Sequence, residues 1–185
     1  NAAGWFEMPM ALGDRIGRLI GAGEGCVACC DTISVNLYKV LHACLALRPG
    51  RRVILAEASS FPTDLYIAEG VCAAAGARLV LAKGPVEAAL GPEVAAMLVN
   101  HVDYRTGEVR GMGALSDAAH AAGALAVWDL SHSAGALEVE LDRDGADFAV
   151  GCTYKYLNGG PGAPGFVHAA ARHHGGIRQP GSGWG

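Results

Sequence analysis

The sequence has 185 residues, about half of them apolar, and a formal net charge of -4 at pH 7. A chain of this length can bury one sizeable core, so a single domain is expected. Only 17% of the residues are charged and the basic ones are scattered, which argues against nucleic acid as a partner. No apolar run reaches the ~20 residues of a membrane-spanning helix. We therefore expect a soluble protein whose partners are small organic molecules.

The six cysteines lie mostly inside apolar runs. A chain of this size does not need disulfide bonds, so we expect reduced cysteines and a cytoplasmic protein. Cys26 and Cys29 have the spacing of a metal-binding pair, but no second pair follows to complete four ligands, and no metal site is expected. The sequence lacks an initiator Met and a signal peptide. Its first and last residues suggest a fragment of a longer protein.

Short apolar runs alternate with helical patterns along the chain. The apolar runs do not alternate with polar residues, which is typical of strands covered on both faces; they lie at 51–58, 77–82, 93–102, 124–130, 147–152 and 165–170. The helical patterns lie at 34–47, 62–76 and 113–123. This order predicts an α/β fold with a mostly parallel sheet flanked by helices. Ligands bind at the carboxyl ends of such strands.

Polar or aromatic residues stand at four of these strand ends. They are Phe61 to Asp64, Asn100 with His101, Asp129 with His132, and Tyr154 with Lys155. An ordinary α/β domain also has polar residues at these places, so position alone decides little. An Asp at the end of an apolar strand requires a partner, solvent or a hydrogen bond. It either caps a turn or takes part in a site, and no GxSxG motif supplies the nucleophile of a hydrolase triad.

The segment before the first helical pattern holds Asp31, Thr32 and Ser34. These residue types cap helices, and a capped helix is the interpretation that the local sequence favours. The free N–H groups of such a helix start also bind phosphate. No GxxxxGK[ST] or GxGxxG motif opens a helix, which argues against nucleoside triphosphates and dinucleotides.

Lys155 is one of only three lysines and stands between two tyrosines before a glycine-rich segment. It is either a surface lysine or a partly desolvated amine that attacks a carbonyl. A helix start suited to phosphate, an aromatic ring at Phe61, a carboxylate at Asp129 and this lysine together are what pyridoxal phosphate requires.

The sequence resembles kynureninase, a fold-type-I pyridoxal-phosphate enzyme, along essentially its whole length. The segments that carry the resemblance, in order, are "DTISVNLYK", "FPTD", "NHVDYRTGE", "DLSHSAGA" and "TYKYLNGGPG". An Asp followed by a distant Lys recurs across fold type I, whereas "YKYLNGGPG" together with "FPTD" is specific. The resemblance implies the three-layer α/β/α large domain of these enzymes, here incomplete, without an N-terminal segment and the small C-terminal domain.

The resemblance also implies which residues bind pyridoxal 5'-phosphate. The phosphate would bind Ile33, Ser34 and Tyr154, and the ring would stack on Phe61, with Pro62, Thr63 and Asp64 beside it. Asp129 would pair with the ring nitrogen next to His132, Lys155 would bond the aldehyde, and Asn100 stands where the family usually has Ser or Thr. Trp184 would reach the cofactor across a homodimer interface. Lys155, Tyr154 and Asp129 are the expected catalytic residues.

The activity that the resemblance implies is hydrolysis of L-kynurenine or 3-hydroxy-L-kynurenine to L-alanine and anthranilate or 3-hydroxyanthranilate, in tryptophan catabolism. The arginine that holds the substrate carboxylate in the family would lie outside this chain. Two alternatives stay open. One is another fold-type-I enzyme such as a cysteine desulfurase or selenocysteine lyase, although these usually have a histidine where Tyr154 stands. The other is a non-catalytic fragment or pseudoenzyme.

Overall fold

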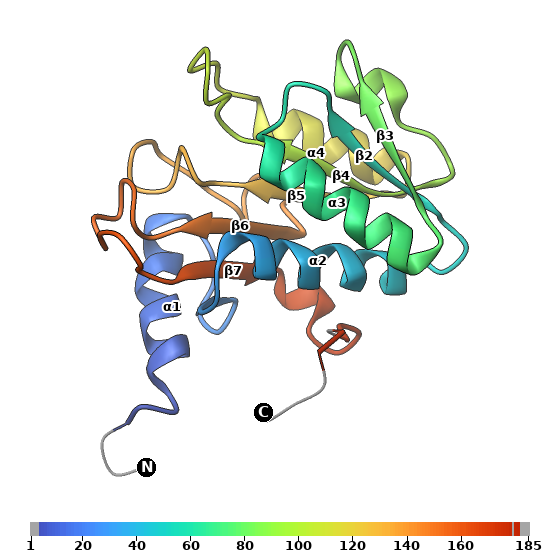
Figure 1. Ribbon diagram of the computed structural model, residues 1–185. Helices are drawn as coiled ribbons and strands as arrows, with labels where there is room; N and C mark the ends of the chain where they lie inside the picture. Colours follow the sequence, from blue (N-terminus) through green and yellow to red (C-terminus); the bar gives the residue numbers. More distant parts are fainter. Residues whose placement is uncertain (1–3, 179, 182–185) are drawn as a thin grey trace.

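The computed structural model describes residues 4–178, 180 and 181. Seven strands form one sheet in the order β1-β7-β6-β5-β4-β2-β3 (Figure 1). Their bounds are β1 Val27–Cys29, β2 Val53–Glu57, β3 Arg78–Ala82, β4 Val94–Asn100, β5 Leu125–Asp129, β6 Phe148–Cys152 and β7 Gly165–Ala169. Strands β2 to β6 pair in parallel, whereas β7 is antiparallel to both β6 and β1. The predicted α/β fold with a mostly parallel sheet is confirmed.

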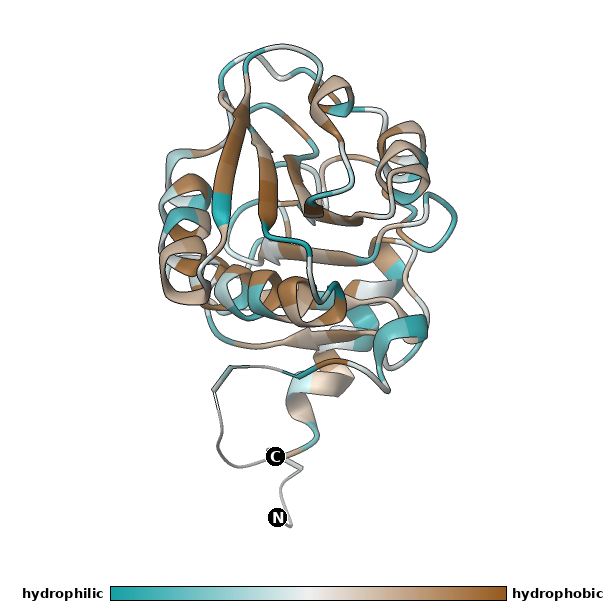
Figure 2. Cartoon of the chain, turned by 90° about the vertical axis from the view of Figure 1, so that its right-hand side faces the viewer, coloured by the Kyte–Doolittle hydropathy of each residue, from teal (hydrophilic) through white to brown (hydrophobic). Residues whose placement is uncertain are grey.

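Helices cover both faces of this sheet. Their bounds are α1 Met8–Leu19, α2 Ile33–Leu47, α3 Pro62–Ala75 and α4 Met112–Ala121, with short 3-10 helices η1 Val86–Ala89 and η2 Ala171–His173. Helices α2 and α3 lie side by side and bury their apolar residues against one face, with Phe148 and Leu98 in the same cluster. Helices α1 and α4 pack on the other face around Trp128. Figure 2 shows the hydrophobic strands enclosed between these layers.

Two expectations from the sequence differ from the structure. The predicted run 77–82 forms β3, but this strand is not covered on both faces, because it is an edge of the sheet and most of its side chains are partly exposed. Neither α1 nor β1 was among the elements predicted from the sequence. These two elements pack closely because α1 has glycine where it meets β1: a Cβ at Gly13 would lie 1.9 Å from the carbonyl oxygen of Val27.

The strand directions bring distant segments to one edge of the sheet. Strands β4, β5 and β6 end there, and β1 ends at the same edge because β7 runs opposite to both of its neighbours. The residues that follow these ends include Thr32, the N-cap of α2, whose hydroxyl accepts the N–H of Val35 at 3.3 Å. The candidate residues therefore meet at the carboxyl edge, where ligands of α/β proteins bind.

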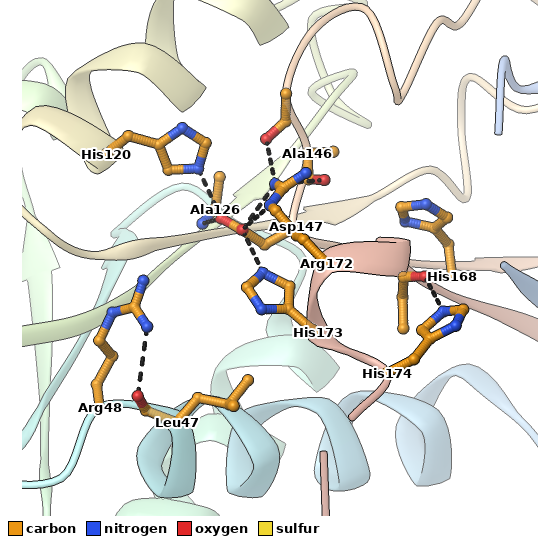
Figure 3. Close-up of polar contacts among 12 residues, drawn as sticks. Leu47, Arg48, His120, Ala126, Ala146, Asp147, His168, Arg172, His173 and His174 are labelled. Carbon is orange, nitrogen blue, oxygen red and sulfur yellow. Dashed lines mark hydrogen bonds and ion pairs between the residues drawn. The ribbon is translucent and has the colours of Figure 1, made fainter. Parts of the chain in front are cut away.

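At the amino ends of the parallel strands, opposite the candidate residues, the buried carboxylate of Asp147 lies just before β6 (Figure 3). His120 Nε2 lies 2.8 Å from its Oδ2, which also accepts the N–H of Ala126 at 2.8 Å. Its Oδ1 lies 2.7 Å from Arg172 Nη2 and 2.6 Å from His173 Nε2. Burial alone would raise the pKa of Asp147, but these hydrogen bonds lower it below its ordinary value. The carboxylate thus fastens η2 to the sheet.

No helix in the described part of the chain is long and apolar enough to cross a membrane.

Candidate active site

A cavity of about 180 Å³ lies at the carboxyl edge of the sheet. Most of the predicted site residues line it: Ile33, Ser34, Phe61, Thr63, Asp64, Asp129, His132, Tyr154 and Lys155. Pro62 and Asn100 are not among its lining residues, and Trp184 lies outside the described residues. Residues that are far apart in the sequence, from Thr32 before α2 to Gly165 in β7, thus share one cavity.

One end of the cavity is the start of α2. The hydroxyl of Thr32 accepts the N–H of Val35, and its carbonyl accepts the N–H of Asn36. Among the described residues, nothing accepts a hydrogen bond from the N–H groups of Ile33 and Ser34. Gly165 leaves this end open: a Cβ there would lie 3.2 Å from the nitrogen of Ile33. Free N–H groups at the positive end of a helix dipole form a cradle for an anion.

Another part of the wall holds two buried aspartates joined by an amide. Asn100 Nδ2 donates to Asp64 Oδ2 and to Asp129 Oδ2, both at 2.8 Å. Ser131 donates to Asp129 Oδ1 from its N–H at 2.8 Å and from its hydroxyl. Burial, and then the negative charge on Asp129, raise the pKa of Asp64 to about 8. At neutral pH Asp64 is therefore mostly protonated.

Lys155 reaches back across the cavity from the segment after β6. Its Nζ lies 2.9 Å from His132 Nε2 and 5.6 Å from the ring centre of Phe61. Burial, and then the positive charge of Lys155, lower the pKa of His132. A neutral imidazole can accept a hydrogen bond from the ammonium group, so His132 fixes the direction of the lysine.

Tyr154 lines the cavity beside Lys155, whose Nζ lies 5.7 Å from the tyrosine ring centre. Burial and the neighbouring Cys152 raise the pKa of Tyr154. Its hydroxyl is therefore protonated at neutral pH and can donate a hydrogen bond into the cavity.

Sequence reasoning assigned no role to several residues that the structure places here. Ser131, Cys152 and Gly165 line the cavity, and the ring of Tyr104 lies 5.0 Å from that of Phe61 and 6.3 Å from that of His132. Ser131 and Tyr104 lie in two of the segments that carry the resemblance to kynureninase, "DLSHSAGA" and "NHVDYRTGE". Their place in these segments was the only indication in the sequence that they belong to the site. Gly165 was visible only as the first residue of a predicted strand.

The fold has close counterparts among solved structures. A cysteine desulfurase from Thermococcus onnurineus NA1 superimposes with a TM-score of 0.83 at 20% identity, over 96% of this chain and 46% of that one. The cystine C-S lyase C-DES gives 0.80 at 17% identity, over 94% and 49%. Identities this low establish the fold alone: a mostly parallel sheet with flanking helices, as in fold-type-I pyridoxal-phosphate enzymes.

Sequence comparison identifies the family. The family model described as Aminotransferase class-V matches residues 35–169, and the chain belongs to this family. Its relatives include proteins named Kynureninase from Burkholderia pseudomallei (strain 1106a), 50% identical, and from Pseudomonas fluorescens, 48% identical. Each comparison covers 100% of this chain and 46% of the relative. The chain thus spans about half the length of these curated relatives.

Proposed function

We propose that the protein containing this chain is a pyridoxal-phosphate-dependent hydrolase that cleaves L-kynurenine, or its 3-hydroxy form, to anthranilate or 3-hydroxyanthranilate and L-alanine. The observation that carries the proposal is the 50% identity to a protein named Kynureninase over the whole chain. The cavity supports it, because it gathers the expected lysine, aspartate and helix start. Such an enzyme would serve tryptophan catabolism.

The chemistry of the cavity wall fits pyridoxal phosphate. The open cradle at Ile33 and Ser34, which a Cβ at Gly165 would fill, suits the phosphate. Asp129 suits a protonated ring nitrogen, because a carboxylate within hydrogen-bond reach favours the charged form by ~1 to 3 pKa units. Lys155 supplies the amine that bonds the aldehyde. When bound, the cofactor supplies the electron sink for bonds broken next to the substrate's amino group.

The chain's own side chains then have defined tasks. Lys155 Nζ moves a proton at the Cα of the substrate, and neutral His132 holds that nitrogen in place. The carboxylate of Asp129 keeps the ring nitrogen protonated. The hydroxyl of Tyr154 would donate a proton to the γ-carbonyl oxygen as water adds to the γ-carbon, and would take one back from the resulting hydrate as the Cβ–Cγ bond breaks. The carboxyl group would then leave on the aryl product, and the electron pair on Cβ would pass to the electron sink that the cofactor supplies. Phe61 presents its ring as a stacking surface.

The proposal also includes an assembly of two subunits. We expect a homodimer in which Trp184 reaches the partner's cofactor, and a substrate-binding arginine outside this chain. Helix α1 exposes Met8, Met10, Leu12 and Leu19, beside an apolar depression that includes Leu157 and Pro164. A second subunit would cover such a surface. All six cysteines are unpaired, which agrees with a cytoplasmic location.

The test uses the complete natural protein. Borohydride reduction in the presence of pyridoxal phosphate should attach the cofactor to Lys155, and kynurenine should then release anthranilate. The Lys155→Arg variant should lose the label, whereas Lys83→Arg, a change on the surface, should keep it. A label elsewhere refutes the cofactor site. A label without anthranilate refutes the reaction, and formation of alanine from cysteine, with sulfide released by an added thiol reductant, would then favour a desulfurase.

A further inference from the structure

Asn100 stands at the centre of the carboxylate side of the site. It is the last residue of β4 and only 6% exposed, and in the parallel register its Cα pairs with that of Asp129. Beyond its two hydrogen bonds to the aspartates, its Oδ1 accepts the N–H of Phe61 at 2.8 Å. Asn100 thus connects the end of β5, the first turn of α3 and Phe61, the N-cap residue of α3.

The orientation of this amide is fixed by chemistry. The NH₂ group faces two carboxyl oxygens and the carbonyl faces an N–H, so all three contacts are attractive. Rotating the amide by half a turn would place its oxygen against the oxygens of Asp64 and Asp129. It would also place its NH₂ against the N–H of Phe61. Only one of the two orientations satisfies the partners.

An amide does here what a hydroxyl cannot. A Ser or Thr side chain has one hydrogen to donate, so at this position it would leave one of the two aspartates without a donor. Asn has two hydrogens on Nδ2 and a separate acceptor for the N–H of Phe61. The hydrogen-bonding groups of Asn100 therefore match the three groups that the fold brings to it.

The hydrogen bonds also decide where the negative charge resides. Asp129 accepts from Asn100 and twice from Ser131, whereas in the described residues the carboxyl of Asp64 accepts only from Asn100. More donors stabilise the charged form of a carboxyl group, so Asp64, with its single donor, is the member of the pair that is suited to hold a proton. The positive charge of Lys155 acts in the opposite direction and lowers the pKa of Asp64, but it is the smallest of the influences on this group.

We infer that Asn100 is a positioning residue: it binds Asp64, Asp129 and the start of α3 into one unit. This unit keeps the charge of Asp129 where the ring nitrogen would bind and keeps Phe61 in the cavity wall. The inference rests on the proposed function for its cofactor but not for its substrate. A residue that acts in this way affects the titration of the aspartates and the affinity for the cofactor, even though it does not line the cavity.

The first test needs no cofactor. In the cofactor-free natural protein, ¹³C NMR follows the titration of Asp64, with Asp64→Asn to assign its signal. Asn100→Leu, which has no donor, should move the midpoint of Asp64 upward by about one to two pH units, the effect of one lost hydrogen bond to a charged group. Asn100→Thr should give a smaller upward movement. An unchanged midpoint in both variants overturns the inference.

The second test measures the dissociation constant of pyridoxal phosphate by fluorescence titration. Asn100→Leu should weaken binding by about ten- to a hundredfold, and Asn100→Thr by less. The control is Ser116→Ala, which removes the buried hydrogen bond from Trp128 Nε1 to Ser116 on the other face of the sheet. It should lower stability but leave the midpoint and the affinity unchanged.

The outcomes separate this inference from the proposed reaction. If Asn100→Leu does not fold, Asn100→Thr carries both measurements alone. An unmodified protein that binds the cofactor at Lys155 but releases no anthranilate refutes the reaction and leaves the role of Asn100 standing. Equal affinity of the Asn100 variants and the parent overturns that role, whatever the substrate.

Discussion

His168 is expected to make the fold sensitive to acid. It lies in β7 between Val27 and Ala149 of the neighbouring strands and is fully buried. In the described part of the chain, neither ring nitrogen has a hydrogen-bond partner. Burial lowers the pKa of His168 to about 4, although the carboxylate of Asp142, 4.0 Å from Nε2, acts in the opposite direction. Folding therefore favours the neutral imidazole.

The sign and size of the change in folding stability with pH follow from the pKa of His168. In the unfolded chain the histidine binds a proton as the pH falls through its ordinary value of 6.5, whereas in the folded protein it does so only near 4. Stability is therefore fully present above 6.5 and is lost as the pH falls toward 4. The interval of about 2.5 pH units, at about 1.4 kcal/mol for each, corresponds to a loss of about 3 kcal/mol.

The perturbation is His168→Leu, and the assay is urea denaturation at about pH 7 and about pH 5. The variant should be as stable as the parent or more stable at neutral pH, because it removes two unpaired buried polar atoms. Between the two pH values the parent should lose about 2 kcal/mol more than the variant. Equal losses in both proteins would refute the reasoning, since every other titrating group is shared.

Three further predictions concern other parts of the molecule. Gly165→Ala should weaken pyridoxal-phosphate binding about tenfold in a fluorescence titration, because its Cβ would crowd the anion cradle; Gly91→Ala, with nothing within 4 Å of the added Cβ, should not. Asp147→Ala should lower the free energy of unfolding in urea by about 3 to 5 kcal/mol, because buried donors lose their partner. A loss below about 1 kcal/mol would contradict the role of Asp147 in fastening η2 to the sheet. Tyr154→Phe should lower kcat for anthranilate release about a hundredfold while the cofactor remains bound, and unchanged turnover would exclude Tyr154 as the proton donor.

Much of the fold could be predicted because buried parallel strands are encoded locally. The apolar run before Asp129 and the one before Tyr154 each end where a strand ends. Helix α1 was missed for a physical reason. Its buried face consists of Gly13, Ile16 and Gly17, and glycine disfavours helices in isolation. Here glycine is required because α1 touches the backbone of β1.

The candidate site was predictable as a set of residues but not as a network. A polar residue at the end of β4 could be read from the sequence, yet Asn100 bonds to residues 36 and 29 positions away. Such partners depend on strand order and register, which no local pattern specifies. For the same reason the sequence could not show that Asn100 reaches the cavity wall through Asp64, Asp129 and Phe61, and its assignment to the cofactor stays a prediction.

The pairing of β1 with β7 has a consequence for the order of events during synthesis. Strand β1 is an edge strand that, among the residues the structure describes, pairs with β7 alone. It leads directly into the helix start that forms the anion cradle. Residues 27–34 leave the ribosome before residues 165–169, on which their place in the sheet depends and which are made more than a hundred residues later. The cradle therefore assembles late, and a nascent chain that stops short of β7 has no complete place for an anion.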